Sequence, residues 1–230
     1  MNLLDEGLGK IYPACVNAAD GIPLESVEKL GCILEKYIRE IELFNGIYSL
    51  VSYSSRSELI VKHILDSLAP LPFLLKALLQ NGAGSKAFHI ADLGSGAGLP
   101  GIPLAAALPG CQLTLIEQME RRAVFLENAL AILNLSNTAV LQTSCENTAS
   151  IRSAHNAGYT MAVCRAFHPF DPKLYKSIKR LLAPCGIIAL YKGRKSLFEK
   201  ELNAVPDVCA EILPCHVPFL DEERHLLIIR

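Results

Sequence analysis

One glycine-rich turn constrains this chain more than any other feature of its sequence. A short apolar run over residues 87–93 leads into Asp92-Leu-Gly-Ser-Gly-Ala-Gly98, and another apolar stretch follows at residues 99–108. The first run predicts a buried strand, and the second predicts a helix that tolerates two prolines in its first turn. The three alternating glycines accept positive φ angles and let backbone N–H groups approach a ligand closely. We therefore expect a ligand-binding turn between a strand and a helix.

Strand-like and helix-like segments alternate after this turn. Further strands are predicted at residues 112–116, 138–142, 159–164 and 186–191, and helices at residues 121–133 and 172–182. The last two apolar segments, residues 208–217 and 225–230, are predicted to form an antiparallel hairpin at the end of the sheet. This alternation predicts an α/β fold with a doubly wound, mostly parallel sheet, whose ligand lies at the carboxyl ends of the central strands.

The chain before the turn is predicted to be helical. Apolar residues recur at helical spacing over residues 24–44, and further helices are expected at residues 57–68 and 72–79. A glycine-rich loop at residues 81–85 separates these helices from the alternating region. We therefore predict a helical N-terminal extension over residues 1–84 and a Rossmann-like domain over residues 85–230, together forming one compact unit.

Composition excludes several classes of protein. The 230 residues are 51% hydrophobic and contain no run of about 18 apolar residues, and the N-terminus lacks the pattern of a signal peptide. The eight cysteines include no C-x-x-C pair, so we expect reduced, mostly buried thiols and no metal site. These features predict a cytoplasmic protein without a membrane segment, and we expect a monomer.

Positive charge is concentrated in one part of the chain. Residues 173–200 contain eight lysines and arginines and a single acid, Glu199. Such an excess suits a phosphate backbone, because each contact releases condensed counterions. A solvated helix face is an equally good interpretation of this composition.

Two classes of ligand compete for the glycine turn. Gly96-Ala-Gly98-Leu-Pro-Gly101 formally matches the dinucleotide fingerprint, and Glu117 lies at about the expected distance beyond it. The match nevertheless starts two residues late, and Asp92 at the strand end would repel a pyrophosphate. S-adenosylmethionine carries no phosphate but has a sulfonium and an ammonium, which a nearby carboxylate favours. The turn therefore favours S-adenosylmethionine, and an NAD-dependent oxidoreductase is an alternative.

Other residues at strand ends are candidates for the same site. Glu117 ends the second strand, where a carboxylate can accept both ribose hydroxyls, although an ordinary cap or an exposed acid is the alternative. Cys145 and Glu146 follow the third strand and are candidates to bind the adenine edge, or else form a plain loop. Pro184-Cys185 and Pro214-Cys215 resemble the nucleophile motif of cytosine-C5 methyltransferases, but we expect Cys185 to be a structural thiol.

The chain resembles the glucose-inhibited division protein B family, the bacterial small-subunit (16S) ribosomal RNA guanine-N7 methyltransferases, over nearly all of residues 30–230. The motifs that carry the resemblance are Asn45-Gly-Ile-Tyr48-Ser-Leu50, His63-Ile-Leu-Asp66-Ser67, Asp92-Leu-Gly-Ser-Gly-Ala-Gly-Leu-Pro-Gly-Ile-Pro103, Arg121-Arg122 with Phe125-Leu126, Arg165-Ala-Phe167, Lys192-Gly193 and Glu223-Arg224-His225. The family often has an aspartate where this chain has Thr160, and residues 1–25 match nothing in it.

The resemblance implies a class I methyltransferase fold that binds S-adenosylmethionine and methylates N7 of a guanine in 16S ribosomal RNA or in the small ribosomal subunit. Its implied cofactor-binding residues, together with those inferred from the turn, are Asp92, Gly94, Gly96, Gly98, Leu99, Glu117, Cys145, Glu146 and Arg165. The basic residues predicted to contact RNA are Arg121, Arg122, Lys176, Lys179, Lys192, Arg194 and Arg224.

This reaction requires few catalytic groups. Guanine N7 has a lone pair and no proton at neutral pH, so alignment with the methyl group is expected to carry most of the catalysis. Arg165 is the candidate that orients the base or a phosphate, and an ion pair with Asp92 or another acid is its alternative role.

Other residues are candidates for the substrate pocket. His63 and Asp66 are candidates to line it, and Phe167 is a candidate to stack on the base. Arg224 and His225 either contact RNA or are structural.

Three other functions fit parts of the pattern. The same chemistry can act on a small molecule or a protein, in which case the basic segment has no role in binding RNA. An NAD-dependent oxidoreductase would be stabilised by NAD(H) rather than by S-adenosylmethionine. A non-catalytic RNA-binding or ribosome-assembly factor would bind RNA but transfer no methyl group.

Overall fold

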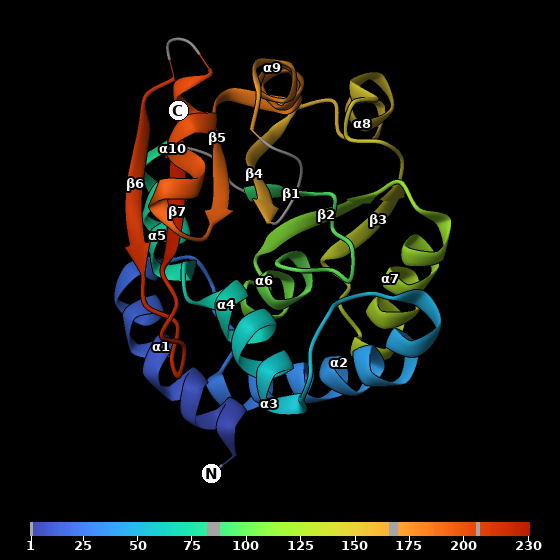
Figure 1. Cartoon of the computed structure of the whole chain (residues 1–230). Helices are drawn as coiled ribbons and strands as arrows, with labels where there is room; N and C mark the ends of the chain where they lie inside the picture. The colour runs from blue at the N-terminus through green and yellow to red at the C-terminus, as the bar shows by residue number, and fades with distance from the viewer. Residues whose placement is uncertain (1, 82–87, 166–169, 206–207) are drawn as a thin grey trace.

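The protein is a three-layer α/β/α structure in a computed structural model that describes residues 2–81, 88–165, 170–205 and 208–230. Its described strands form one sheet in the order β3-β2-β1-β4-β5-β7-β6 (Figure 1). The strands are β1 (Phe88–Leu93), β2 (Cys111–Glu117), β3 (Thr138–Gln142), β4 (Tyr159–Arg165), β5 (Leu182–Lys192), β6 (Ala210–Cys215) and β7 (Arg224–Ile229). The first five pair in parallel, and β7 pairs antiparallel with both β5 and β6. The predicted sheet and C-terminal hairpin are confirmed.

Helices cover both faces of the sheet. One face carries α1 (Leu3–Ala19), α2 (Val27–Tyr48), α5 (Leu71–Asn81), α6 (Gly101–Ala107) and α7 (Glu120–Leu133). The other carries α8 (Thr148–Ala154), α9 (Pro172–Leu181) and α10 (Lys195–Asn203). Figure 1 shows α8 and α9 above the sheet, with α2, α6 and α7 below it.

Two hydrophobic clusters follow from this layering. Because side chains alternate along a strand, Ile187 and Ala189 of β5 belong to one cluster, whereas Ile188 and Leu190 belong to the other. The first cluster also contains Leu8 of α1, so the N-terminal helices share a core with the sheet.

The sequence analysis predicted a helical extension over residues 1–84 but named no individual helix where α1 lies. Its N-cap is Asn2, whose side chain accepts a hydrogen bond from the Asp5 N–H. Leu4, Leu8 and Ile11 are buried on one face, at the spacing of an amphipathic helix. The short helices α8 and α10 were also missed, because each has only one buried residue and hence little apolar periodicity.

The helix predicted over residues 57–68 is continuous but not uniform. It consists of α3 (Arg56–Leu59), a π-helical segment η1 (Ile60–Leu65) and α4 (Asp66–Leu68). Hydrogen bonding across η1 includes the Asp66 N–H to the Val61 carbonyl, an i to i+5 contact. π-helical segments are rare and occur frequently at functional sites.

The cysteines correct one expectation. All eight thiols are free, but only Cys15, Cys111, Cys164 and Cys215 are buried, so the thiols are not mostly buried. Cys185, expected to be a structural thiol before its strand, is exposed and lies within β5 at a φ of 63°.

Two features are absent from the described residues. None of the helices found there is long and apolar enough to cross a membrane. Within the same residues, no group of three or more histidine, cysteine, aspartate and glutamate side chains is arranged to hold a metal ion.

Thr160, the departure from the family pattern, lies at the start of β4. Its Oγ1 accepts a hydrogen bond from the His89 N–H (2.9 Å) and donates one to the His89 carbonyl (2.8 Å). Thr160 therefore joins β1 to β4 near their amino ends, opposite the sheet edge where β1 enters the glycine turn.

Candidate functional site

The glycine turn leaves β1 in a conformation that glycine favours. Gly94, Gly96 and Gly98 have φ angles of 70°, 59° and 94°. The N–H groups of Gly94 and Ser95 both donate to the Ile116 carbonyl, at 2.9 and 3.0 Å. The turn is therefore fixed between the carboxyl ends of β1 and β2.

Two glycines of the turn have different surroundings. A Cβ atom on Gly98 would lie 2.5 Å from Cδ1 of Ile102, so this glycine is required for packing against α6. Among the described residues, a Cβ atom on Gly96 would meet nothing closer than the Gly94 carbonyl oxygen, at 3.9 Å. The space beside Gly96 is open, as a bound ligand requires.

Asp92 lies beneath this turn and is almost completely buried. Its Oδ2 accepts a hydrogen bond from the Gly101 N–H (3.0 Å), whereas its Oδ1 has no partner among the described residues. Burial raises the pKa of Asp92 from 3.8 to about 7, and the nearby Ser95 hydroxyl and the Gly101 N–H only partly oppose this shift. A buried carboxylate oxygen without a partner is suited to a cationic or hydrogen-bond-donating ligand.

This pKa predicts a pH-dependent stability. A carboxyl whose pKa is higher in the folded than in the unfolded protein stabilises the fold when protonated, and this contribution is lost as the pH rises from about 4 through about 7. We expect Asp92→Asn to remove this dependence. Between pH 5 and pH 8, the free energy of unfolding of the wild type should fall by roughly 2 to 3 kcal/mol relative to the variant. Urea denaturation of both proteins measures the difference, and parallel pH profiles would contradict it.

Glu117 lies at the carboxyl end of β2, next to the open side of Gly96. It is buried, and its Oε2 accepts from the Gly96 N–H while its Oε1 accepts from the Met119 N–H, both at 2.8 Å. The alternative of an exposed acid is therefore wrong. Since each carboxylate oxygen has a second lone pair, Glu117 retains acceptor capacity for two hydroxyl groups.

The remaining residues predicted at the cofactor side lie close to this turn or after β3. Leu99 is buried in the core beside the turn. Cys145 is half-buried, and the exposed Glu146 forms an ion pair with Lys173 of α9 at 3.0 Å. The Glu146 carboxylate thus contacts α9.

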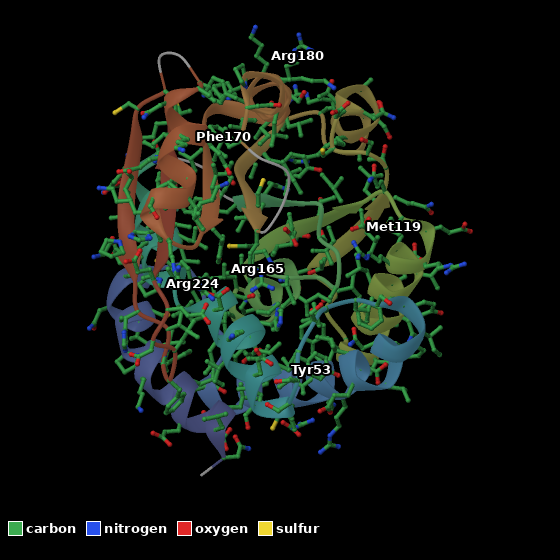
Figure 2. All side chains as sticks on the ribbon, viewed as in Figure 1. Tyr53, Met119, Arg165, Phe170, Arg180 and Arg224 are labelled. Atoms are coloured by element: carbon green, nitrogen blue, oxygen red, sulfur yellow. The ribbon has the colours of Figure 1, made fainter. Side chains whose placement is uncertain are left out.

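A cavity of about 510 Å³ lies at the carboxyl ends of β4 and β5 and the start of β7. Its polar lining comes from the helix over residues 56–68 and from these strands. Its lining residues include Lys62, His63, Asp66, Phe170, Leu174, Tyr191, Lys192, Arg224 and His225, together with Arg165. In Figure 2, Arg165 lies near the centre of the molecule, with Arg224 to its left and Phe170 above them.

Arg165 ends β4 and is held at this cavity by three partners. Its Nη1 donates to Oδ2 of Asp66 (2.9 Å) and to the Lys62 carbonyl (3.2 Å), and its Nη2 contacts Nδ1 of His63 (3.1 Å). Sequence reasoning suggested Asp92 or another acid as its ion-pair partner, and the acid is Asp66. Arg165 thus combines a structural ion pair with a place in the cavity wall.

His63 is neutral in this arrangement. A guanidinium only donates, so Nδ1 of His63 accepts from Arg165, and Nε2 carries the proton donated to the Ser52 carbonyl (3.1 Å). Burial lowers the pKa of His63, and the neighbouring Arg165 lowers it further. His63 therefore connects the loop before α3 to Arg165.

Comparison with known proteins identifies the family. The GidB family model, described as rRNA small subunit methyltransferase G, matches residues 32–227. The chain belongs to the GidB methyltransferase family. The ribosomal RNA small subunit methyltransferase G of Treponema denticola is 36% identical, covering 91% of this chain and 89% of that protein. The protein of the same name from Treponema pallidum is 40% identical, covering 87% and 85%.

A solved structure supports the fold. Aeropyrum pernix fibrillarin, in complex with natively bound S-adenosyl-L-methionine, superposes with a TM-score of 0.50 at 13% identity, covering 68% of this chain and 74% of that chain. The fold is that of class I S-adenosylmethionine-dependent methyltransferases, as predicted. The chain is a methyltransferase, and the alternative of an NAD-dependent oxidoreductase is wrong.

In this GidB methyltransferase, the basic residues predicted to bind RNA occupy different surroundings. Lys192 lies in the cavity wall and forms an ion pair with Glu201 (2.6 Å), and Arg224 forms one with Asp66. Arg122 is half-buried at the start of α7. The exposed members of the set are Arg121, Lys176, Lys179 and Arg194. Phe167, proposed to stack on the base, lies outside the described residues.

Sequence reasoning missed one residue that supports the turn. The hydroxyl of Tyr37, which is fully buried in α2, donates to the Ala97 carbonyl at 2.6 Å. This bond connects the N-terminal helices to the glycine turn. The available signal was a tyrosine on the apolar face of α2, because a buried phenol hydroxyl usually requires a partner.

Proposed function

We propose that this chain transfers a methyl group from S-adenosylmethionine to N7 of a specific guanine in small-subunit (16S) ribosomal RNA. The observation that carries the proposal is the pairing of two sites at one sheet edge: the open glycine turn with two buried acids, and the cavity with two arginines. The names of the Treponema relatives support ribosomal RNA as the substrate.

The residues of the turn fit the cofactor. Glu117 offers acceptors for the ribose hydroxyls, the unpartnered Oδ1 of Asp92 lies beneath the turn, and Gly96 leaves room above it. Two buried carboxylates make the site poor for a pyrophosphate and suitable for a ligand with cationic groups. The bound cofactor supplies a methyl group on a sulfonium sulfur.

The cavity fits an extruded nucleotide. Its volume of about 510 Å³ lies within the usual range for small-molecule sites. Phe170, Leu174 and Tyr191 supply apolar wall, and Arg165 and Arg224 supply donors. Enzymes that modify a base take it out of its stack and bind it between apolar side chains with hydrogen bonds to its edge.

The chain's own groups account for the chemistry. N7 of guanine needs no general base, so the residues of the cavity have to hold the base in line with the methyl group. Positive charge passes to the guanine during transfer, and nearby acceptors stabilise it. Arg165 would orient the base or its phosphate through the N–H groups that Asp66 and His63 leave free.

The exposed face of α9 is the proposed RNA-binding surface. Lys176, Lys179 and Arg180 are exposed, and within the described part of the chain they have no ion-pair partner. We propose that this surface binds the RNA backbone, that the enzyme acts as a monomer, and that it works in the cytoplasm, where ribosomal subunits are found.

Neutralising this surface tests its role. We expect the triple variant Lys176→Gln, Lys179→Gln and Arg180→Gln to weaken RNA binding about tenfold at moderate salt and to flatten the salt dependence, because fewer counterions are released. The matched control replaces three exposed lysines of α1 and α2, Lys10, Lys29 and Lys36, with glutamine. If both triple variants bind RNA equally well in a filter-binding assay, α9 does not contribute to RNA binding.

The proposed reaction is tested by methyl transfer from labelled S-adenosylmethionine. The acceptors are small ribosomal subunits, free small-subunit RNA and large-subunit RNA, each isolated from cells that lack the modification. We expect label in small subunits or their RNA and none in large-subunit RNA. If the protein binds the cofactor but transfers no methyl group to small subunits or to their free RNA, its substrate is a different molecule.

A further inference from the structure

We propose that Asp66 is a positioning residue that holds Arg165 and Arg224 together as paired donors for the target guanine. The inference rests on the proposed function and assigns a role that neither arginine has alone. It predicts that Asp66 affects the reaction through the two arginines, without itself contacting the reacting atoms.

The Asp66 carboxylate binds a different arginine with each of its two oxygens. Oδ2 accepts from Nη1 of Arg165 at 2.9 Å, and Oδ1 accepts from Nε of Arg224 at 3.0 Å. Arg165 ends β4 and Arg224 starts β7, and β5 lies between these strands. One carboxylate therefore joins two arginines that the sheet itself keeps on non-adjacent strands.

Both arginines keep N–H donors that are not used within the described part of the protein. A guanidinium has five N–H groups. Arg165 uses three of them, on Asp66, His63 and the Lys62 carbonyl. Arg224 also uses three, on Asp66, the Glu222 carboxylate and the Glu223 carbonyl. Two N–H groups on each arginine thus have no partner among the described residues, and both arginines line the cavity.

Guanine and adenine differ in the groups that they would present to these donors. Guanine presents two acceptors, N7 and O6, on the edge that reacts, whereas adenine presents an amino donor in place of O6. N7 must stay free to attack the methyl group, so O6 is the acceptor left for a guanidinium. Guanidinium N–H groups fixed at this position can hydrogen-bond to O6 of guanine. With adenine, the same N–H groups would face the amino donor of the base, which is unfavourable. The paired arginines are thereby suited to select the base.

Asp66 directly follows the π-helical segment η1. The π-helical segment η1 ends at Leu65, and its wider turn places His63 and Asp66 where both bind Arg165. Asp66 itself is 8% exposed, and among the described residues its side chain bonds only to the two arginines. Residues of the π-helical segment, the buried Asp66 and both arginines therefore line the same cavity.

The experiment compares Asp66→Asn with a matched control, Glu222→Gln. Glu222 also contacts Arg224 (3.0 Å) but from the exposed side. For Asp66→Asn we expect kcat/KM for small-subunit RNA to fall about 30- to 100-fold, mainly through a higher RNA KM, with the cofactor KM within about twofold. Glu222→Gln should stay within about threefold of the wild type.

A mutant cycle distinguishes positioning from general destabilisation. Adding Asp66→Asn to the double variant Arg165→Gln and Arg224→Gln should lower kcat/KM by less than about threefold, because Asp66 then has no arginine to position. A further 30-fold loss of kcat/KM in this triple variant would overturn the inference. An unchanged RNA KM in Asp66→Asn alone, or a cofactor KM that rises as much as the RNA KM, would also overturn it.

If Asp66→Asn does not fold, the variant Arg224→Gln provides the test. A raised RNA KM with an unchanged cofactor KM supports the pairing, and an unchanged RNA KM overturns it.

The outcome for the wild type separates the two proposals. If the unmodified chain transfers no methyl group to small-subunit RNA, the proposed function fails and this inference fails with it. If the wild type is active while Asp66→Asn is indistinguishable from Glu222→Gln, only the role of Asp66 is wrong.

Discussion

Replacing Gly96 with leucine is expected to abolish methyl transfer while leaving the protein folded. The side chain would enter the open space beside the turn, where the nearest atom is 3.9 Å from the added Cβ, and would fill the volume required by the cofactor. The positive φ of 59° costs the leucine roughly 1 kcal/mol, which a folded domain tolerates. We expect cofactor affinity to fall at least about 100-fold and transfer to become undetectable. Calorimetric titration with S-adenosylmethionine and the transfer assay measure these effects.

The matched control is Gly9→Leu. Gly9 is an exposed glycine of α1 with nothing within 4 Å of its added Cβ, so the same side chain is introduced away from the turn. Gly98→Leu should instead lower thermal stability strongly, because Ile102 already occupies the space of its Cβ. A Gly96→Leu protein that binds the cofactor normally would show that the open side of the turn is not the cofactor site.

Replacing Arg165 with glutamine is expected to give the second large effect. The variant loses the charge that pairs with Asp66 and the free donors in the cavity, so we expect kcat/KM for RNA to fall about 100-fold or more, equivalent to about 2.7 kcal/mol of transition-state stabilisation. Cofactor affinity should stay within about threefold of the wild type. Because the Arg165 and Asp66 side chains are only 13% and 10% exposed, the variant should also lose roughly 3 kcal/mol of stability.

Two measurements keep the catalytic and structural effects apart. Circular dichroism at the assay temperature establishes that Arg165→Gln is folded, and Arg39→Gln, an exposed arginine of α2 paired with Glu35, serves as the control. RNA methylation within about threefold of the wild type in folded Arg165→Gln would remove this arginine from the site. If cofactor affinity falls as much as kcat/KM for RNA, Arg165 contributes to binding the cofactor rather than the RNA.

The parts of the fold that sequence predicts well are those encoded locally. Residues 138–142 were predicted as a strand with the bounds that β3 has, and the glycine turn was placed correctly, because alternation, apolar runs and glycine spacing are local signals. The acids Asp92 and Glu117 were chosen as candidates on the same kind of local signal, since each lies at a strand end next to the turn.

The arrangement of the cavity depends on long-range contacts that no local pattern contains. Asp66 contacts Arg165 and Arg224, which are 99 and 158 residues away along the chain. His63 and Asp66 were recognised as candidates, but their common partner follows only from the packing of the helix over residues 56–68 against β4 and β7. The π-helical segment has no sequence signature of its own. The support of the turn by Tyr37 similarly joins residues 60 positions apart.

The most direct test of the central claim is to map the methylated atom. Small subunits that lack the modification are incubated with the enzyme and S-adenosylmethionine, and the RNA is treated with borohydride and aniline, which cleave at N7-methylguanine. We expect cleavage at a single guanine of the small-subunit RNA, present with the wild type and absent with Gly96→Leu. Label incorporated without any such cleavage, or cleavage that persists with Gly96→Leu, would contradict the central claim.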